Sequence, residues 1–522
     1  MLARGLLGSC LVLLGGLVGA VLPRTARVLE VEALVDLRGS EVGRMLGLAV
    51  VLAGLALLAA SWLALCRHVA ALRERDLALW TVRRAVVVWS APLLLAPPLF
   101  SRDGWSYAAQ GMLAHLGIDP YQHGPGVLRG PVANAVDERW MDTPTPYGPV
   151  PLGFGEVVSG LTGNPWLLAV GYRVMALVGL ALLVWAVPRL AAWTRVDAAL
   201  ATAIVAASPF MVANGVAGMH NDLLMTGLAA AALVVAVERG WVWGALLGGT
   251  AAAVKAPGGL VCVAVALVTL PLAAPLLARV RRLAAVAAVS LAWLFGLGVV
   301  VGTGAGWLGA LSVPASVNTP LSLTTLLGGT LDWTAGLLGL GLEPATMLDL
   351  VRQVGTLGIL AMVGWAALRR PTGDREAAVV TAAALMGLIV LLSPVVHLWY
   401  LLWALPFLAV LRLSRTSLGG LLAAAVVGGL VAPMDSSLHG AYYAIVLGSV
   451  MVAVLTAVLL LTPAARLRVE RIVAGHWPRV AAFDLAATAE VGEMHARGGS
   501  SAPIETPAES PAEVSAPAAP SR

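Results

Sequence analysis

The sequence contains little charge, few cysteines and a single lysine. Of its 522 residues, 12% are charged and 59% are hydrophobic, and the mean hydropathy is +0.88. A soluble domain could not bury so much apolar surface, so the composition excludes that class and indicates a polytopic membrane protein. Cys10, Cys66 and Cys262 all lie in or at the edge of apolar runs, which argues against a disulfide framework or a metal cluster.

Long apolar runs recur from the start of the chain to about Leu461. A helix of about 20 apolar residues crosses the ~30 Å hydrocarbon core of a bilayer. We therefore predict an all-α bundle with about fourteen membrane-spanning helices. The predicted spans cover residues 5–22, 45–66, 85–100, 165–188, 198–216, 223–237, 241–255, 258–277, 283–302, 347–368, 377–393, 398–411, 418–433 and 441–462. Because the runs between 223 and 255 are short and rich in glycine, one hairpin or a re-entrant pair is the alternative there.

Arginine-rich connectors follow the second, fourth, eighth, tenth and twelfth predicted spans, all on one side of the membrane. The positive-inside rule makes this side cytoplasmic, although the outer connector 23–44, with mixed charges, is an exception. Both termini are then cytoplasmic, and the loops 101–164, 303–345, 393–397 and 434–440 face outward. The first run also fits a signal peptide, but an even number of spans with both ends inside requires that it be retained. We expect a multi-pass plasma-membrane protein whose net charge of +5 reflects topology, not nucleic-acid binding.

The chain divides into three parts by composition. Residues 1–84 contain N-terminal spans and a cytoplasmic loop, and residues 85–463 contain the membrane core with its two large outer loops. Residues 464–522 form a cytoplasmic segment that becomes rich in Ala, Pro, Glu and Ser after Arg479 and has few large apolar residues to bury. We expect that segment to be largely disordered.

A carboxylate stands directly after the third predicted span, at the start of the first large outer loop. Asp103 follows Phe100-Ser101-Arg102, and beside apolar helices its side chain would be partly desolvated. A substrate arriving from outside could lose a proton to such a group, so we interpret Asp103 as a general base. The alternative is an N-cap for a helix predicted from Trp105 to Gly117, which has an amphipathic pattern and would lie on the membrane surface.

The same loop is rich in aromatic side chains. Trp105, Tyr107, Tyr121, Trp140 and Tyr147 lie within it, two of them in the turn sequences Asp119-Pro120-Tyr121 and Pro146-Tyr147-Gly148-Pro149. Aromatic rings beside polar groups stack on sugars, although at a membrane border the same residues can form an aromatic belt.

Two cations lie at or within the apolar segments. Lys255, the single lysine, precedes Pro257-Gly258-Gly259, which should break its helix, and it either snorkels to the interface or grips a phosphate. Arg173 lies eight residues past Pro165, about 12 Å along the helix at 1.5 Å per residue. A charge at that depth indicates a bound anion or a buried carboxylate partner.

Two shorter outer elements place polar and aromatic groups at the same membrane edge. His220-Asn221-Asp222 stands between two predicted spans, where Asn221 or Asp222 could equally cap the following helix. His397-Leu398-Trp399-Tyr400 opens a later span and offers either belt residues or sugar contacts. One histidine and one aspartate fall short of a metal site.

At these residues the chain resembles the polyprenol-phosphomannose-dependent α-1,6-mannosyltransferases of actinobacteria, multi-span members of the glycosyltransferase C superfamily. The resemblance runs from about Arg83 to Leu461. The residues that carry it are Arg102-Asp103, Ser106-Tyr107-Ala108-Ala109-Gln110-Gly111, Asp119-Pro120-Tyr121, Pro146-Tyr147-Gly148-Pro149, His220-Asn221-Asp222, Lys255-Ala256-Pro257, Ser393-Pro394 and Trp399-Tyr400.

The resemblance implies that a polyprenyl-phosphate-mannose donor enters from the bilayer and that Asp103 activates the 6-hydroxyl of an acceptor mannose, with inversion at the anomeric carbon. The acceptor would be a mannan or phosphatidylinositol-mannoside-type glycolipid, extended toward the α-1,6-mannan backbone of lipomannan and lipoarabinomannan. Lys255, Arg173 and Arg102 are the candidates for the departing phosphate. No cofactor is required, although a divalent metal is compatible with the chemistry. The residues expected to contact sugar are Trp105, Tyr107, Gln110, Asp119, Tyr121, Tyr147, His220, Asn221, Asp222, His397, Trp399 and Tyr400.

Two other functions share part of this pattern. Another polyprenyl-phosphate-sugar transferase, mannosyl or arabinosyl, would have the same architecture, since nothing in the sequence specifies the sugar. A lipid-linked sugar transporter or flippase would also have many spans and intramembrane charges, but it predicts inverted repeats and a midplane site. We find no relation between the halves, and the polar groups gather at the outer edge, which favours an enzyme.

Overall fold

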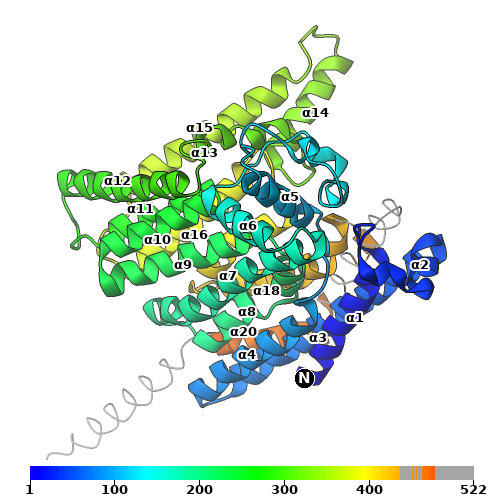
Figure 1. Cartoon of the computed structure of the whole chain (residues 1–522). Coiled ribbons are helices and arrows are strands. Elements are labelled where there is room, and N and C mark those ends of the chain that lie inside the picture. Colours follow the sequence, from blue (N-terminus) through cyan, green and yellow to red (C-terminus); the bar gives the residue numbers. More distant parts are fainter. Residues whose placement is uncertain (436–449, 452–453, 455–457, 459–460, 477–522) are drawn as a thin grey trace, which may run out of the picture. The chain divides into compact units, whose positions relative to one another are not determined.

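The structure, a computed structural model, describes residues 1–435, 450–451, 454, 458 and 461–476. These residues form helices and turns, and they contain no β-strand, which confirms the predicted all-α fold (Figure 1). Within the described part of the chain, six helices are long and apolar enough to cross a membrane: α1 Leu2–Gly19, α3 Glu41–Ala71, α7 Pro165–Thr194, α12 Leu276–Val300, α15 Thr346–Arg369 and α16 Arg375–Leu392. A seventh span results if α8 Ala198–Ala206 and the π-helix η6 Met211–Ala217, bent by 55°, are counted together.

Other apolar segments are shorter than a full span or, like the 18-residue helix 222–239, carry too many charged residues to count as one. They are α4 Arg75–Ser90 with η2 Ala91–Leu93, α9 Asp222–Arg239, α10 Trp241–Val254, η7 Ala256–Leu260 with α11 Val261–Val268, η9 Leu398–Trp403 with α17 Leu405–Leu408, and α18 Arg415–Leu430. The predicted count of fourteen spans is therefore not confirmed. The run 85–100 is not one straight helix, because Pro92, Pro97 and Pro98 interrupt it, and the run 441–462 lies mostly outside the described residues.

The hairpin alternative for 223–255 matches the observed structure. α9 and α10 are joined at Gly240, whose φ of 102° is one that glycine adopts at little cost. Pro257 stops α10 as expected, so that Lys255 is extended between α10 and η7. α9 packs closely on α7 as well: Gly179 of α7 faces the Leu223 backbone, and Gly227 of α9 faces the Gly179 backbone, as small residues do between membrane helices.

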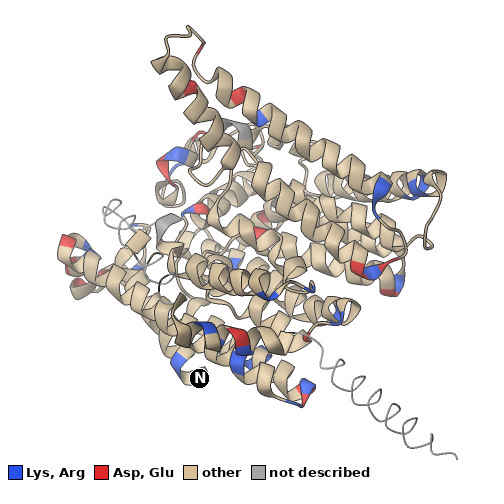
Figure 2. Cartoon of the chain, turned by 180° about the vertical axis from the view of Figure 1, so that it is seen from behind, with Lys and Arg blue, Asp and Glu red and all other residues tan. Residues whose placement is uncertain are grey.

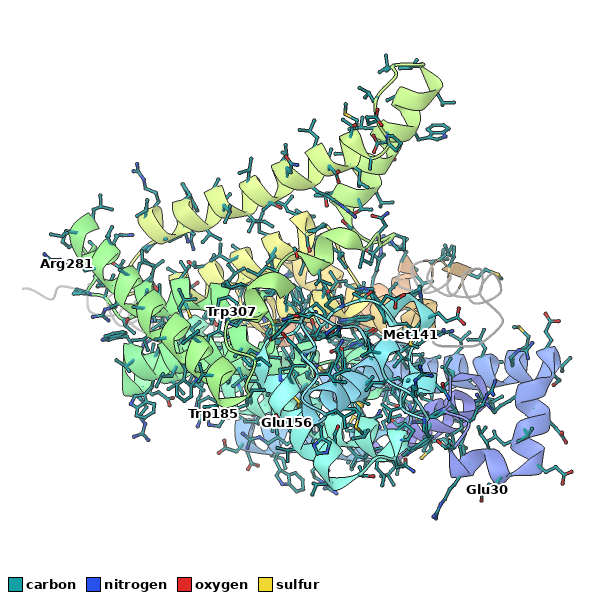
Figure 3. The ribbon with its side chains drawn as sticks, turned by 45° about the horizontal axis from the view of Figure 1, so that its top comes forward. Glu30, Met141, Glu156, Trp185, Arg281 and Trp307 are labelled. Atoms are coloured by element: carbon teal, nitrogen blue, oxygen red, sulfur yellow. The ribbon has the colours of Figure 1, made fainter. Side chains whose placement is uncertain are left out.

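The remaining elements belong to connectors. The N-terminal connector forms η1 Arg27–Glu30 and α2 Glu32–Gly39, with Glu30 labelled in Figure 3. The first large loop contains α5 Asp103–His115, η3 Pro125–Val127, η4 Ala133–Ala135, η5 Glu138–Trp140 and α6 Pro149–Leu161, and the second contains α13 Trp307–Ala310, η8 Val313–Ser316 and α14 Leu323–Leu337. η10 Ala432–Asp435 follows α18, and residues 463–476 of the C-terminal segment form α20 Pro463–His476. Figure 2 shows the charged residues mainly at helix ends and turns, with long tan stretches between them.

The helix at the start of the first loop differs from the prediction in its surroundings. We expected an amphipathic helix lying on the membrane surface, but α5 packs against α6 and α7, with Trp105, Tyr107 and Leu113 buried. Gly111 permits this packing, because a Cβ there would lie 2.6 Å from the Gly155 Cα atom of α6. Asp103, Ser106, Tyr107 and Gln110 of α5 line a pocket, whereas His115 at its end is exposed.

Candidate active site

A sharp turn places Asp103 at the first position of α5. Phe100, buried and with a left-handed φ of 65°, reverses the chain after η2, and such a conformation costs of order 1–3 kcal/mol unless its surroundings impose it. Ser101 then accepts a hydrogen bond from the Asp103 amide at 3.1 Å. No side chain caps the N-terminus of α5, so the Asp103 carboxylate is not the cap that the alternative interpretation required.

Arg173 holds this turn in place. Its guanidinium donates to the carbonyl oxygens of Leu94 at 3.0 Å and Pro97 at 3.3 Å, and it also reaches Ala96 and Ala217. The side chain is 1% exposed. Backbone carbonyls released by the broken helix accept hydrogen bonds from the two terminal nitrogens of Arg173, and none of the described carboxylates forms an ion pair with it. The predicted anion at Arg173 stays a prediction. Arg173 positions the turn that carries Asp103.

The Asp103 carboxylate lies within a set of hydroxyl and imidazole groups. Tyr107 donates to Asp103 Oδ2 at 3.4 Å, and its hydroxyl is 3.0 Å from that of Tyr147. The Nδ1 atom of His220 is 3.7 Å from Asp103 Oδ2 and 3.4 Å from the Tyr107 hydroxyl. Burial raises the pKa of Tyr107 well above its usual value, and Tyr147 and the Asp103 charge raise it further. Tyr107 therefore remains a neutral donor to the carboxylate.

A second left-handed residue brings His220 to Asp103. Met219, with φ 60°, ends the bent segment after η6, and its side chain packs at Gly104. Burial lowers the pKa of His220 well below its usual value, and the charges of Lys255 and His397 lower it further, so the imidazole is neutral at neutral pH.

An aromatic stack supports this imidazole. The ring of Trp399 is sandwiched between His220, at a centroid distance of 3.6 Å, and His397, at 4.4 Å. Trp399 is 3% exposed, so it acts as a spacer between two histidines and does not face the pocket.

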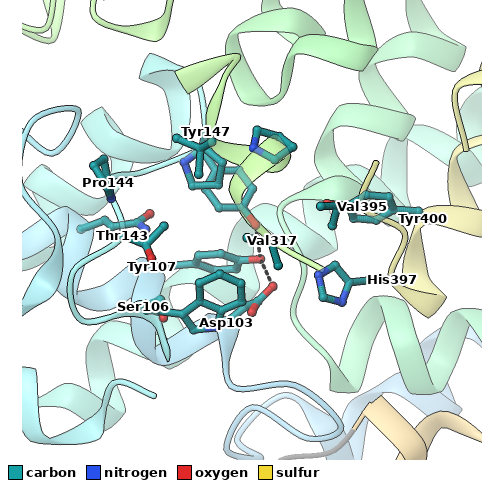
Figure 4. Close-up of a pocket in the computed structure, with 15 residues that line it drawn as sticks. Asp103, Ser106, Tyr107, Thr143, Pro144, Tyr147, Val317, Val395, His397 and Tyr400 are labelled. Carbon is teal, nitrogen blue, oxygen red and sulfur yellow. Dashed lines mark hydrogen bonds between the residues drawn. The ribbon is translucent and has the colours of Figure 1, made fainter. Parts of the chain in front are cut away.

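Asp103 lines a pocket whose walls come from both large outer loops and from the 393–400 segment (Figure 4). We call this the Asp103 pocket. Its lining residues are Asp103, Ser106, Tyr107, Gln110, Trp140, Thr143, Pro144, Pro146, Tyr147, Val313, Pro314, Val317, Val395, His397 and Tyr400. The Asp103 side chain is 16% exposed, so a ligand in the pocket can reach the carboxylate. Five of the predicted sugar contacts line the pocket: Tyr107, Gln110, Tyr147, His397 and Tyr400.

Lys255 and Asp222 form a buried ion pair behind the pocket wall. Lys255 Nζ lies 2.8 Å from Asp222 Oδ1, which also accepts a hydrogen bond from Trp403 Nε1 at 2.7 Å. The ammonium is 4.2 Å from the ring centroid of Tyr400 and 5.3 Å from that of Tyr147, within the range of cation–π attraction. The structure thus gives Lys255 a carboxylate partner where we expected a phosphate, and Asp222 is too buried to meet a sugar.

Arg102 is engaged in a similar way. Its guanidinium lies 2.7 Å from Asp137 Oδ2, and Arg139 pairs with the same carboxylate at 3.0 Å. Although burial raises the pKa of Asp137, hydrogen bonds from Arg139 and the charges of Arg139 and Arg102 hold it at about 2. Neither Arg102 nor Lys255 nor Arg173 lines the Asp103 pocket, and their contact with a donor phosphate stays a prediction.

Several other predicted contacts lie outside the lining of the Asp103 pocket. Trp105 is fully buried and donates to the Val21 carbonyl. Asp119 accepts from the Tyr121 amide in a turn, and the Tyr121 hydroxyl donates to the Tyr147 carbonyl. Asn221 is 1% exposed and precedes α9 without capping it. These residues shape the loops and do not line the pocket.

Sequence reasoning missed the contribution of the second outer loop. Val313, Pro314 and Val317 close one side of the Asp103 pocket. Nothing in the apolar, proline-containing sequence 313–317 distinguishes it from a connector. Among the described residues, no group of three or more His, Cys, Asp or Glu has the arrangement of a metal site.

Residues 2–274 match the family model described as alpha-(1->6)-mannopyranosyltransferase, N-terminal domain, and residues 324–462 match the MptB C-terminal domain. A probable alpha-(1->6)-mannopyranosyltransferase of Mycolicibacterium smegmatis is 32% identical over 77% of this chain and 77% of its own. Alpha-(1->6)-mannopyranosyltransferase A of Mycobacterium tuberculosis is 31% identical over 84% of this chain and 85% of its own. The enzyme of that name from Corynebacterium glutamicum is 30% identical over 58% of this chain and 65% of its own.

Proposed function

Because the chain belongs to the alpha-(1->6)-mannopyranosyltransferase family, we propose that this membrane-embedded mannosyltransferase takes mannose from a polyprenyl-phosphate donor. The acceptor is the 6-hydroxyl of a mannose on a glycolipid of the phosphatidylinositol-mannoside type, and the product extends an α-1,6-mannan of lipomannan and lipoarabinomannan. Transfer takes place at the outer face of the plasma membrane, with both termini in the cytoplasm. The observation that carries this proposal is the reachable Asp103 carboxylate inside a pocket of hydroxyl, amide and aromatic groups.

Asp103 acts as the general base in one displacement. Its carboxylate takes the proton of the acceptor 6-hydroxyl, the oxygen attacks the anomeric carbon, and the bond to the phosphate oxygen breaks. Polyprenyl phosphate leaves, and a β-linked donor yields an α-linked product. Tyr107 donates to one carboxylate oxygen, which orients the group without protonating it, because a phenol is a far weaker acid than a carboxyl group.

The pocket walls supply the sugar contacts. Tyr147, His397 and Tyr400 line the pocket with Asp103 (Figure 4). Gln110, whose Oε1 accepts a hydrogen bond from the Thr145 hydroxyl at 3.0 Å, adds an amide to the lining. Rings of this kind stack on pyranose faces, while amide and hydroxyl groups form hydrogen bonds with sugar hydroxyl groups. The Lys255–Asp222 pair stiffens this wall from behind, since its ammonium lies against Tyr147 and Tyr400.

The donor phosphate needs a cation, and the four nearest the site differ in exposure. The side chain of Arg139 is 74% exposed, against 27% for Arg102 and 9% for Lys255, and Arg173 is buried. Arg139 also lines a neighbouring cavity that shares Trp140, Val317 and His397 with the Asp103 pocket. We place the departing phosphate near Arg139, where a guanidinium can offset its charge.

Asp103→Asn tests the proposal. The amide keeps the shape of the side chain and loses the base, so transfer from polyprenyl-phosphate mannose should fall by about 10²–10⁴-fold while the melting temperature stays nearly unchanged. Glu156→Gln, which makes the same change on α6 outside the pocket, should retain transfer. Full activity in the Asn variant would remove Asp103 as the base, and a panel of polyprenyl-phosphate sugars would separate mannosyl from arabinosyl transfer.

A further inference from the structure

A cavity at the far end of α1 gathers arginines from three helices. Arg4 of α1, Arg67 of α3 and Arg468 of α20 line it together with Ala60, Leu63, Ala465, Val469 and Ile472. We call it the arginine cavity. It encloses about 220 Å³, several times the about 30 Å³ that one water molecule occupies in the liquid. No residue of the Asp103 pocket belongs to it.

The positive charge of the arginine cavity is not offset by an acid on the described part of the chain. The charges of Arg468, Arg4 and Arg471 all act on Arg67, and none of these four residues is in an ion pair with a described carboxylate. Arg4 donates only to neutral groups, Ser61 Oγ at 3.1 Å and the Ala60 carbonyl at 3.0 Å. Like charges held together repel each other, so an anion in the cavity would lower the free energy of the packed helices.

The length of α1 places the arginine cavity at the membrane boundary opposite the Asp103 pocket. α1 has 18 residues and is about 27 Å long at 1.5 Å per residue, close to the ~30 Å of the hydrocarbon core. Arg4 lies in its first turn, whereas Val21, just past its other end, accepts a hydrogen bond from Trp105, two residues from Asp103. If α1 spans the bilayer, the two sites face different leaflets.

We propose that the arginine cavity binds the phosphate group of an anionic membrane lipid in the leaflet opposite the Asp103 pocket. Guanidinium groups form paired hydrogen bonds with phosphate oxygens, and arginines on three helices surround a phosphate from several sides. Leu63, Val469 and Ile472 line the cavity beside the guanidinium groups, and this apolar wall fits a lipid better than a free anion. The bound phosphate would also fasten α20 to α1 and α3.

The test measures lipid affinity by the rise in melting temperature of the purified full-length protein in detergent. Phosphatidylglycerol is titrated against phosphatidylcholine, which has the same phosphate but no net charge, and against inorganic phosphate. The variant Arg67→Gln/Arg468→Gln removes two charges from the cavity. Its control, Arg73→Gln/Arg466→Gln, removes two exposed charges next to the same helices, neither of which lines the cavity.

We expect phosphatidylglycerol to stabilise the wild type and the control variant, and its affinity to fall by roughly tenfold or more in the cavity variant, since charge-assisted contacts of about 1.5–3 kcal/mol are lost. Equal losses in both variants, or none in the cavity variant, would overturn the proposal. Stabilisation by inorganic phosphate alone would overturn the lipid assignment. If the double variant does not fold, Arg67→Lys, which keeps the charge but loses the paired geometry, must weaken the lipid effect as well.

Discussion

At the residue scale, the candidate site depends on two backbone conformations that non-glycine residues rarely adopt. Phe100 and Met219, both with positive φ, turn two separate segments so that Asp103 and His220 meet. Both turns are buried, and Arg173 bonds to the carbonyls that precede the first one. The geometry around the carboxylate is thus imposed by its surroundings, as expected where strain is retained at a functional site.

The buried ion pair between Lys255 and Asp222 leads to a prediction about stability. Lys255→Met leaves the Asp222 carboxylate buried, with the hydrogen bond from Trp403 but without its cation, and breaking a buried pair costs about 3–5 kcal/mol. We expect the melting temperature of the variant to fall clearly, with turnover reduced through the displaced Tyr147 and Tyr400.

The double variant Lys255→Met/Asp222→Asn distinguishes this structural role from phosphate binding. Removing the orphaned charge should recover much of the lost stability, which thermal unfolding of the two variants measures. If Lys255 held the donor phosphate instead, the single variant would keep its stability and lose turnover, and the second substitution would rescue neither.

At the scale of elements, contact between α5 and α6 sets the depth of the Asp103 pocket. Gly111 of α5 faces the Gly155 Cα atom and the Tyr172 hydroxyl, which would lie 2.6 and 2.8 Å from an added Cβ. Tyr172 donates to the Pro151 carbonyl of α6 at 3.0 Å, so the three helices α5, α6 and α7 meet at this point. A displacement of α5 moves Asp103 and Tyr107 together, because both lie on it.

Gly111→Ala tests this packing. Overpacking of a tight contact costs about 1–3 kcal/mol, and we expect both a lower melting temperature and a larger relative loss of turnover, because α5 carries Asp103. Gly387→Ala is the matched control, since Gly387 lies in α16 with no atom within 4 Å of an added Cβ. Equal behaviour of the two variants in turnover assays would show that α5 tolerates displacement.

At the scale of the whole molecule, the orientation in the membrane decides which substrates can reach Asp103. On a background without Cys10, Cys66 and Cys262, we expect His123→Cys and Glu343→Cys, in the two large loops, to react with an impermeant thiol reagent in intact cells. Arg375→Cys, at the first residue of α16 next to the basic connector, should react only after the membrane is opened. The reverse pattern would place Asp103 in the cytoplasm and remove the basis for an outer-face donor. All three positions are exposed, so a lack of labelling is not explained by burial.

The sequence by itself determined the class of the molecule and the chemistry of its family. Composition and long apolar runs are local properties, so the all-helical membrane fold could be predicted before any contact was known. Short motifs around Asp103, Tyr147 and Lys255 were enough to predict the family, which the comparisons confirm, and the helix after Asp103 was predicted nearly at its observed bounds. The predicted number of membrane spans was not confirmed, because prolines and glycines divide several apolar runs into shorter helices.

Only the tertiary structure decided which of the polar residues face the ligand and which face each other. Lys255 meets Asp222 across 33 residues, and Asp222 meets Trp403 across 181, separations over which sequence carries no pairing signal. An ammonium, carboxylate or guanidinium group is the same chemical group whether it lines a pocket or forms a buried ion pair. The packing of helices that are distant in the sequence determines which partner it meets. For this reason the structure places Asp103 in the pocket lining, whereas Arg173, Lys255 and Trp105 lie behind the lining and support it.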